Sequence, residues 1–400
     1  MATAAGVNMS GSISADVAII GGGIMGASLA YWLTLLDPTV CVTVVERDPG
    51  YTTASSALSA ASIRQQFTSA INIRISQASI EWLRNAHEHL AVDGDSPDIG
   101  LQERGYLHLV HEAGQPALQE AHALQHSLGA DVVLLDRPQL KARFPWLDVS
   151  DLAAGALGLS GEGWFDAYTL LMSLVRKARS QGARFIRGDV TRVEATERRV
   201  ASIELADGTR IACRFAINAA GPWARAVARL AGAELPVFAR RRTVYVIGCK
   251  SEMPRFPLVI DPSGFWIRPE GVSFIAGFAP QQDPDDAPLE PDYEAFETEL
   301  WPALAARIPA FEAARLERAW AGYYEMNVFD YNGIVGFHPQ IENLAFMNGF
   351  SGHGVQQAPI VGRGMAEHIL FGRFQTLDLS ALAYTRLTEN APDQELQVIG

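Results

Sequence analysis

Three glycines between two apolar segments constrain this chain more than any other feature. Residues 18–20 have the composition of a buried strand, and Gly21, Gly23 and Gly26 then open directly into an apolar helix expected over 24–36. This spacing provides a tight turn at the first glycine, close approach of backbone to a pyrophosphate at the second, and close helix–strand packing at the third. The helix N-terminus adds unpaired N–H groups and a positive dipole end. The stretch therefore predicts a dinucleotide-binding turn.

A second apolar strand, expected over 40–45, ends on Glu46. This acid stands about 20 residues beyond the last glycine, where a carboxylate accepts hydrogen bonds from a ribose. A glycine turn alone is weak evidence, but the turn, its flanking strands and the acid together indicate a Rossmann-type domain. The stretch 17–36 is also apolar enough for a membrane window, although its glycines and its acidic flanks Asp16 and Asp37 argue against a span. We therefore expect no integral membrane segment.

Length, charge and cysteine usage limit the remaining possibilities. A chain of 400 residues exceeds what one core comfortably holds, so two domains are expected. The net charge of −13 repels nucleic acid and anionic lipid, and we expect neither as a partner. The three cysteines are far apart in apolar runs, which indicates buried, reduced thiols and a cytoplasmic protein. His122 and His126 lack the glutamate of a zinc-protease helix, so no metal site is expected.

Three further stretches place small residues where a backbone can approach a ligand closely. Small residues with recurring serines run over 52–62, where hydroxyls can donate to phosphate oxygens or where the chain can simply form a flexible linker. A strand ends in the small residues of 218–223, with a proline placed for a helix start. The glycine-rich segment 348–354 precedes a helix expected over 355–370, whose N-terminus is a second place suited to anionic character.

Together these segments resemble the D-amino-acid oxidase (DAO) family of flavoproteins. This is a group of two-domain oxidoreductases of the glutathione-reductase type that includes monomeric sarcosine oxidase and glycine oxidase. The resemblance covers nearly the whole chain and rests on the 21–26 turn with Glu46, the serine run, 218–223 and 349–354. The segments 62–67 and 350–359 are similar to one subgroup, the mitochondrial FAD-dependent oxidoreductase-domain protein tied to respiratory complex I assembly and its bacterial relatives.

The resemblance implies an α/β fold with an α+β insert. A glutathione-reductase-type Rossmann FAD-binding domain would be combined with a discontinuous antiparallel-sheet substrate domain. The expected limits are an FAD-binding domain over 14–95, 152–234 and 321–385, a substrate domain over 96–151 and 235–320, and flexible termini over 1–13 and 386–400.

The resemblance also implies noncovalent FAD. The strand around Gly322 has no cysteine and the serine run has no histidine, the residues that bond the flavin in some relatives. The glycine turn would hold the pyrophosphate, Glu46 the ribose and Arg47 the adenine edge, while Val190 would meet the adenine through its backbone. The expected FAD-binding residues are Gly21, Gly23, Ile24, Met25, Gly26, Glu46, Arg47, Ser55, Ser56, Ala57, Ser62, Val190, Ala219, Ala220, Gly221, Trp223, Gly322, Gly352, His353, Gly354, Val355 and Gln356.

The implied reaction is oxidation of the C–N bond of a small amino acid or N-substituted amine, with hydride passing to the flavin and the imine hydrolysing. A guanidinium can hold the substrate carboxylate bidentately, and Arg64 and Arg268 are the candidates. His353 is expected near the flavin edge, and Tyr323 completes the expected catalytic set together with Gln356. The sequence departs from the sarcosine pattern at Gln356, where a lysine would help to hold the carboxylate.

The expected fate of the electrons follows from a missing lysine. Sarcosine-type oxidases place a lysine over the flavin from a strand corresponding to 272–277, which has none here. This favours a dehydrogenase that passes electrons to a quinone or a carrier protein. Through that acceptor the protein would be located at the periphery of a membrane. An oxidase that reduces oxygen to hydrogen peroxide, a 2-hydroxyacid dehydrogenase and a non-catalytic FAD-bound assembly factor stay open as alternatives.

Overall fold

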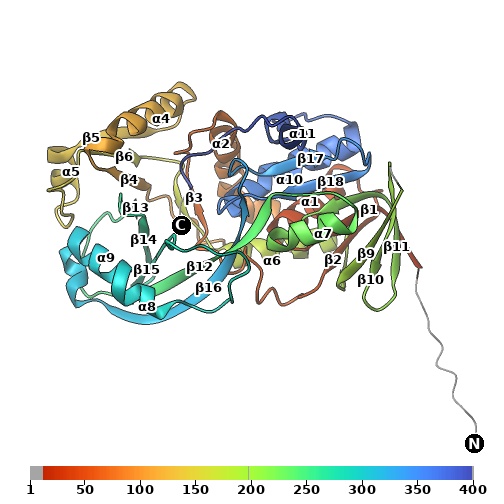
Figure 1. The fold of residues 1–400 in the computed structure, drawn as a ribbon, viewed down its shortest axis with the longest axis horizontal. Helices are drawn as coiled ribbons and strands as arrows, with labels where there is room; N and C mark the ends of the chain where they lie inside the picture. The colour runs from red at the N-terminus through yellow and green to blue at the C-terminus, as the bar shows by residue number, and fades with distance from the viewer. Residues whose placement is uncertain (1–11, 197, 399–400) are drawn as a thin grey trace, which may run out of the picture.

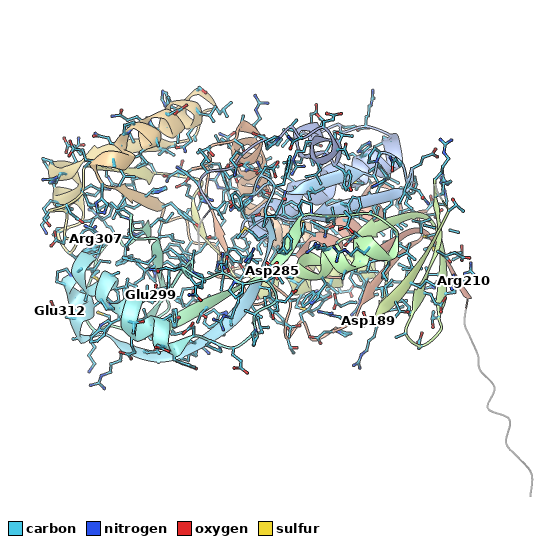
Figure 2. The ribbon with its side chains drawn as sticks, viewed as in Figure 1. Asp189, Arg210, Asp285, Glu299, Arg307 and Glu312 are labelled. Atoms are coloured by element: carbon cyan, nitrogen blue, oxygen red, sulfur yellow. The ribbon has the colours of Figure 1, made fainter. Side chains whose placement is uncertain are left out.

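The protein consists of two lobes that lie side by side along its longest axis (Figure 1). The computed structural model describes residues 12–196 and 198–398. Arg210 lies at the far end of one lobe and Arg307 in the other (Figure 2). Each lobe is built on an eight-stranded sheet, which confirms the expected mixed α/β architecture.

The first sheet is of the Rossmann type. Its order is β17-β18-β11-β1-β2-β8, with the hairpin β9–β10 added beside β11. The strands from β18 to β8 are parallel to one another, and β17 is antiparallel. Helices cover the sheet, so β2 is buried along nearly its whole length rather than at alternate residues. The strands are β1 (Ser12–Ile20), β2 (Val42–Glu46), β8 (Arg184–Arg187), β9 (Val190–Ala195), β10 (Val200–Leu205), β11 (Arg210–Asn218), β17 (Ile334–Phe337) and β18 (Leu344–Asn348).

Most helices of this lobe form one core around α1, whereas the helix over 224–230 packs in a second core. Ser28 of α1 donates to the Ala358 carbonyl of α10 at 2.7 Å, and Gly362 allows the two helices to meet, because an added Cβ there would lie 2.3 Å from Ser28 Oγ. Asp166 caps α6 by accepting from the Thr169 N–H. The helices are α1 (Ile24–Leu36), α2 (Ala70–Arg84), α3 (Ala86–His89), α6 (Ala167–Ser180), α7 (Ala224–Leu230), α10 (Gly354–Phe371) and α11 (Thr385–Thr388).

The second sheet has the order β16-β12-β15-β14-β13-β4-β6-β5. Its neighbours are antiparallel except β13 and β4, which are parallel. The strands are β4 (Tyr106–Val110), β5 (Val132–Asp136), β6 (Ala154–Gly158), β12 (Val237–Gly248), β13 (Leu258–Ile260), β14 (Phe265–Glu270), β15 (Ser273–Phe278) and β16 (Arg315–Asn327). Its helices are α4 (Gln115–Ser127), α5 (Arg137–Arg143), α8 (Tyr293–Ala295) and α9 (Trp301–Arg307).

A short ladder and several single turns complete the fold. Strand β3 (Ser62–Ile63) pairs with β7 (Gly163–Trp164) where the chain passes between the lobes. The 3-10 or π-helical turns are Glu112–Gly114, Gly221–Trp223, Phe296–Leu300, Pro309–Ala313 and Ser380–Leu382.

Two expected domain limits are shifted. Strand β6 was expected in the nucleotide-binding segment that starts at 152, but it pairs with β4 and β5 in the second sheet. The limit at 321 falls inside β16, which continues to Asn327 against β12. Short apolar strands can join either sheet, and long-range pairing rather than local sequence selects the partner.

The expectation of flexible termini is also corrected where the structure describes them. Residues 12–13 already belong to β1, and residues 1–11 lie outside the described part of the chain. In the segment 386–398, Arg386 and Glu395 are 6% and 0% exposed and both form hydrogen bonds to the lobe. Polar bonds rather than apolar packing hold this segment, which is why its hydrophilic sequence suggested a free end.

The cysteines differ from expectation as well. Cys41 is exposed, and Cys213 and Cys249 are partly buried rather than buried, although all are free thiols. Within the described ranges, no helix combines the length and the apolarity that crossing a bilayer requires.

Candidate functional site

The glycine turn after β1 lets the chain pack on itself and leaves backbone open to a cavity. Gly21 has φ +101°, and an added Cβ there would lie 2.4 Å from the Ala219 carbonyl oxygen. An added Cβ at Gly26 would lie 2.0 Å from the Gly21 carbonyl oxygen. At Gly23 the nearest atom would be Ser56 Oγ at 3.6 Å. The outer glycines therefore serve packing, and Gly23 leaves room for a ligand at the backbone.

Two helix N-termini point into the same cavity, which has a volume of about 370 Å³. Helix α1 starts after Gly23 and helix α10 after His353, and neither start has a side-chain cap. Ile24 and Gly354, the first residues of these helices, line the cavity. Uncapped N–H groups at two helix starts make the cavity suited to anionic groups such as a pyrophosphate.

Glu46 is held rigidly at the end of β2. Its carboxylate accepts from the Gly22 N–H and the Asp48 N–H, both at 2.8 Å, and it lines the cavity. The Arg47 guanidinium stacks 3.6 Å from the centre of the Trp223 ring on the opposite wall. These contacts form a polar, aromatic end of the cavity beside the turn.

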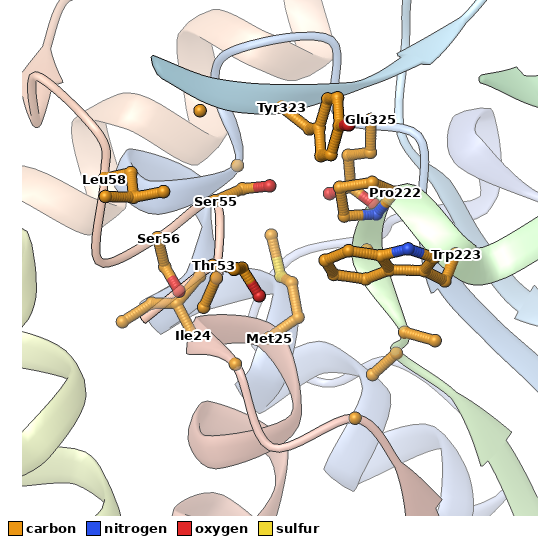
Figure 3. Close-up of a pocket in the computed structure, with 18 of the residues that line it drawn as sticks. Ile24, Met25, Thr53, Ser55, Ser56, Leu58, Pro222, Trp223, Tyr323 and Glu325 are labelled. Atoms are coloured by element: carbon orange, nitrogen blue, oxygen red, sulfur yellow. The ribbon is translucent and has the colours of Figure 1, made fainter. Parts of the chain in front are cut away.

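The serine run lines the cavity from the side (Figure 3). The buried Ser55 Oγ has no hydrogen-bond partner among the described residues, so its donor and acceptor capacity is available to a ligand. Ala57, which we expected to bind the cofactor, does not line the cavity, and Leu58 does instead. Leu58 packs against Gly322, and a Cβ added at Gly322 would lie 3.1 Å from the Leu58 Cβ.

Most of the expected cofactor residues meet at this one cavity although they come from distant segments. Ser62, His353 and Gln356 line a second cavity instead, and Gly26 lies in the packing beneath the turn. The expected residues that line the large cavity are Gly21, Gly23, Ile24, Met25, Glu46, Arg47, Ser55, Ser56, Val190, Ala219, Ala220, Gly221, Trp223, Gly322, Gly352, Gly354 and Val355.

The second cavity adjoins the first and is smaller, about 40 Å³. The two share lining residues that include Trp266 and Tyr324. Arg64, Tyr106 and His353 complete its polar lining, and each of these three is at most 3% exposed. A small, buried chamber with one guanidinium and several aromatic rings therefore opens beside the large cavity.

Arg64 is fixed in this chamber from several sides. Its backbone N–H donates to Gln356 Oε1 at 3.0 Å, and its guanidinium lies 4.0 Å from the centre of the Phe67 ring. The guanidinium donates to the backbone carbonyls of Gln66 and Gln397. Within the described part of the chain, no carboxylate lies within 4 Å of it. Burial lowers the pKa of Arg64, yet an arginine remains charged at neutral pH.

His353 is neutral in this environment. Burial and the nearby Arg64 charge lower the pKa of His353 to about 3. Its ring stands edge-on to Phe67 at 5.4 Å, and its buried Nε2 has no hydrogen-bond partner among the described residues. A neutral imidazole with one free nitrogen can accept a hydrogen bond from an amine.

The other expected catalytic residues have different surroundings. The Arg268 guanidinium donates to the Ala60 carbonyl at 2.7 Å and pairs with Glu270. Arg268 is not among the described residues that line the two cavities. The Tyr323 ring lines the large cavity, but its hydroxyl donates to the Ala287 carbonyl at 2.6 Å. Gln356 holds the backbone of Arg64 rather than presenting a charge.

Sequence reasoning missed the aromatic walls of the chamber. Tyr106 lies on β4 and Trp266 on β14, and the alternation of both strands is that of ordinary core residues. Glu325, which lines the large cavity beside Tyr323 (Figure 3), was also missed. Burial raises the pKa of Glu325 to about 7. No local signal separates these residues from structural ones, because only the pairing of β4, β14 and β16 brings them together.

Comparison with known proteins identifies this arrangement. A family model described as FAD dependent oxidoreductase (DAO) matches residues 16–368. The chain belongs to the DAO family of FAD-dependent oxidoreductases. It is 40% identical to FAD-dependent oxidoreductase domain-containing protein 1 of Xenopus laevis, covering 96% of this chain and 85% of that protein. This similarity confirms the expected family and subgroup.

More distant members of the family share the fold and part of the sequence. Mitochondrial dimethylglycine dehydrogenase of Homo sapiens is 26% identical over 94% of this chain, which matches 45% of the dehydrogenase. The crystal structure of L-proline dehydrogenase from P. horikoshii superposes with a TM-score of 0.84 at 24% identity, covering 95% of this chain and all of the other. The fold of this chain is therefore that of known FAD enzymes.

FAD is the cofactor of this family, and the large cavity fits it. The open backbone at Gly23 and the uncapped start of α1 suit the pyrophosphate, and Glu46 suits the ribose hydroxyls. The second uncapped start, at Gly354, suits the electron-rich end of the flavin ring. Ser55 offers a hydroxyl with no other partner among the described residues.

Proposed function

We propose that this protein is an FAD-dependent dehydrogenase that oxidises the C–N bond of a small secondary amino acid or a related N-substituted amine. The observation that carries the proposal is the buried Arg64 guanidinium, which faces the chamber without a carboxylate partner among the described residues. A family assignment alone leaves the reaction open, because the fold serves several chemistries.

The state of Arg64 calls for an anionic ligand. A buried charge is costly unless it is paired, and the two carbonyls that Arg64 contacts carry only partial charge. Glu395 and Glu162 act on Arg64 only through space, beyond the contact distance of an ion pair. A substrate carboxylate would supply a directly paired charge, and the planar guanidinium can bind it through two parallel hydrogen bonds. The Phe67 ring fixes the plane of the guanidinium, so the carboxylate is oriented as well as bound.

His353 suits the other end of such a substrate. Its neutral Nε2 can accept a hydrogen bond from the substrate amine, and the lowered pKa keeps His353 in the role of an acceptor that holds the amine rather than a base that deprotonates it. FAD, when bound, accepts the hydride from the carbon that carries the amine. Tyr106, Trp266 and Tyr324 surround this region and exclude water from it.

The relatives favour a substituted amine, since a dimethylglycine dehydrogenase and an L-proline dehydrogenase are among them. Among the described residues that line the two cavities there is no lysine. This favours an electron acceptor other than oxygen, such as a quinone or a carrier protein, over the oxidase alternative.

Flavin bleaching tests the proposal. The FAD-loaded protein is mixed anaerobically with sarcosine, dimethylglycine, L-proline, glycine and 2-hydroxyglutarate, and the flavin absorbance is followed. We expect bleaching by at least one of the N-substituted amino acids. Bleaching by the hydroxyacid alone would favour a 2-hydroxyacid dehydrogenase, and no bleaching by any compound would favour a non-catalytic assembly factor.

A second measurement separates a dehydrogenase from an oxidase. Turnover of the same substrate is measured once with oxygen as the electron acceptor and once with an artificial acceptor. We expect the acceptor to support much the faster turnover. Hydrogen peroxide released at a matching rate would make the protein an oxidase.

A further inference from the structure

The segment after α11 returns to the substrate chamber. Arg386 anchors its start by pairing with the fully buried Asp330, with Nε and Oδ2 2.7 Å apart. The chain then runs past the start of α2 (Figure 1), where it contacts Thr68. It thus passes from the Rossmann lobe to the side of the chamber on which Arg64 lies.

Glu395 is what holds this segment in place. Its carboxylate is 0% exposed, and it has no arginine or lysine within 4 Å among the described residues. Five donors surround it at 2.8–3.1 Å, namely the Thr68 N–H and Oγ1, the Ser69 N–H, the Asn72 Nδ2 and the Gln397 N–H. The neighbouring Leu396 is 74% exposed. The Glu395 backbone N–H also donates to the Asp330 carbonyl at 3.1 Å, and Asn332 Nδ2 donates to the Asp393 carbonyl. The segment is therefore held by buried polar contacts, to which the Glu395 carboxylate contributes the most, and not by apolar packing.

This anchoring has a direct effect on Arg64. The Gln397 backbone carbonyl, two residues beyond Glu395, accepts from Arg64 Nη2. The Thr68 hydroxyl fastens the same stretch again by accepting from the Leu396 N–H at 2.9 Å. Nη2 of the guanidinium is thus bound by the segment, while Nη1 donates to the Gln66 backbone carbonyl.

We propose that the segment 393–398 is part of the substrate site and that Glu395 is its positioning residue, which holds the Gln397 carbonyl against Arg64 so that the guanidinium faces the substrate carboxylate. This inference rests on the proposed function, because it takes Arg64 to be the carboxylate-binding group. The segment completes the site rather than competing with the substrate, since the two carbonyls satisfy only part of the five N–H donors of the guanidinium.

Glu395→Gln tests the inference. An amide would place an NH₂ group against donors that now bind an oxygen, so the segment should detach. The FAD-loaded enzyme is titrated with acetate as a carboxylate probe, and the change in flavin absorbance gives the Kd. We expect a Kd at least tenfold higher, and a KM for an amine substrate raised by a similar factor while kcat changes less than threefold. Glu367→Gln is the matched control, because Glu367 is also buried, accepts hydrogen bonds from Gln375 and Thr376 and lines neither cavity, and we expect its Kd to stay within twofold.

Further variants keep the outcome decisive. Thr68→Val removes one hydroxyl from Glu395 at almost unchanged volume, and it should weaken acetate binding in the same direction if Glu395→Gln does not fold. Arg64→Ala should abolish acetate binding, and Glu395→Gln should have no further effect in that background. If Arg64→Ala leaves binding intact, the proposed function fails. If Arg64→Ala weakens binding while Glu395→Gln and Thr68→Val leave it unchanged or tighten it, the inference on the segment is overturned.

Discussion

Replacement of Arg64 by lysine is the most direct test of the site, because it keeps the charge and changes the geometry. The guanidinium already donates to two carbonyls and has N–H groups left for a substrate carboxylate. A lysine ammonium has three donors at one point and cannot serve both carbonyls and a carboxylate bidentately. The loss of two charged hydrogen bonds, at about 1.5–2.5 kcal/mol each, gives roughly 3–5 kcal/mol of lost transition-state binding.

In kinetic terms, this energy corresponds to a fall in kcat/KM of about 100-fold to a few thousand-fold. The assay is steady-state turnover of an N-substituted amino acid with an artificial acceptor, with the FAD content of each variant measured separately. Arg268→Lys is the matched control, since Arg268 is equally buried, at 4% against 3% for Arg64, but is paired with Glu270 and is not among the described residues that line either cavity. A kcat/KM within threefold of wild type for Arg64→Lys, or a larger loss for Arg268→Lys, would refute this assignment.

Four other predictions concern the cofactor cavity and one buried carboxyl group. Gly26→Ala should unfold or strongly destabilise the protein, by about 2 kcal/mol or more, because the new Cβ would lie 2.0 Å from the Gly21 oxygen. Gly23→Ala should instead leave the thermal stability of the apoprotein nearly unchanged and weaken FAD binding, as measured by flavin fluorescence titration. Burial raises the pKa of Glu162 from 4.5 to about 7, so the folded state binds more protons and the free energy of unfolding contributed by this group falls as pH rises through that interval. In denaturant titrations, Glu162→Gln should remove this decrease in the free energy of unfolding, which is at most roughly 3 kcal/mol. If the free energy of unfolding of the variant depends on pH as in the wild type, the raised pKa of Glu162 is contradicted. Acid precipitation should release all of the FAD into the supernatant, whereas flavin retained by the pellet would show a covalent bond.

The sequence by itself determined the cofactor turn, because its chemistry is local. The positions of Gly21, Gly23 and Gly26 relative to one strand and one helix set which backbone atoms can approach each other, and Glu46 follows at the end of the next strand. Such spacings survive any arrangement of the rest of the chain. They were enough to predict a Rossmann-type dinucleotide site, and the resemblance of the serine run, 218–223 and 349–354 to the DAO family implied the rest of the fold and FAD.

The tertiary structure alone decided which charged residues belong to the substrate chamber. Arg64 and Arg268 could not be separated by sequence, since both follow apolar segments and both are buried, yet only the packing of β14 turns Arg268 toward Glu270. The role of Glu395 could not be predicted either, because four of its five donors lie more than 300 residues away along the chain. A charge in a hydrophilic C-terminal stretch resembles a solvated one until long-range contacts bury it, and burial is a property of the folded chain rather than of any segment.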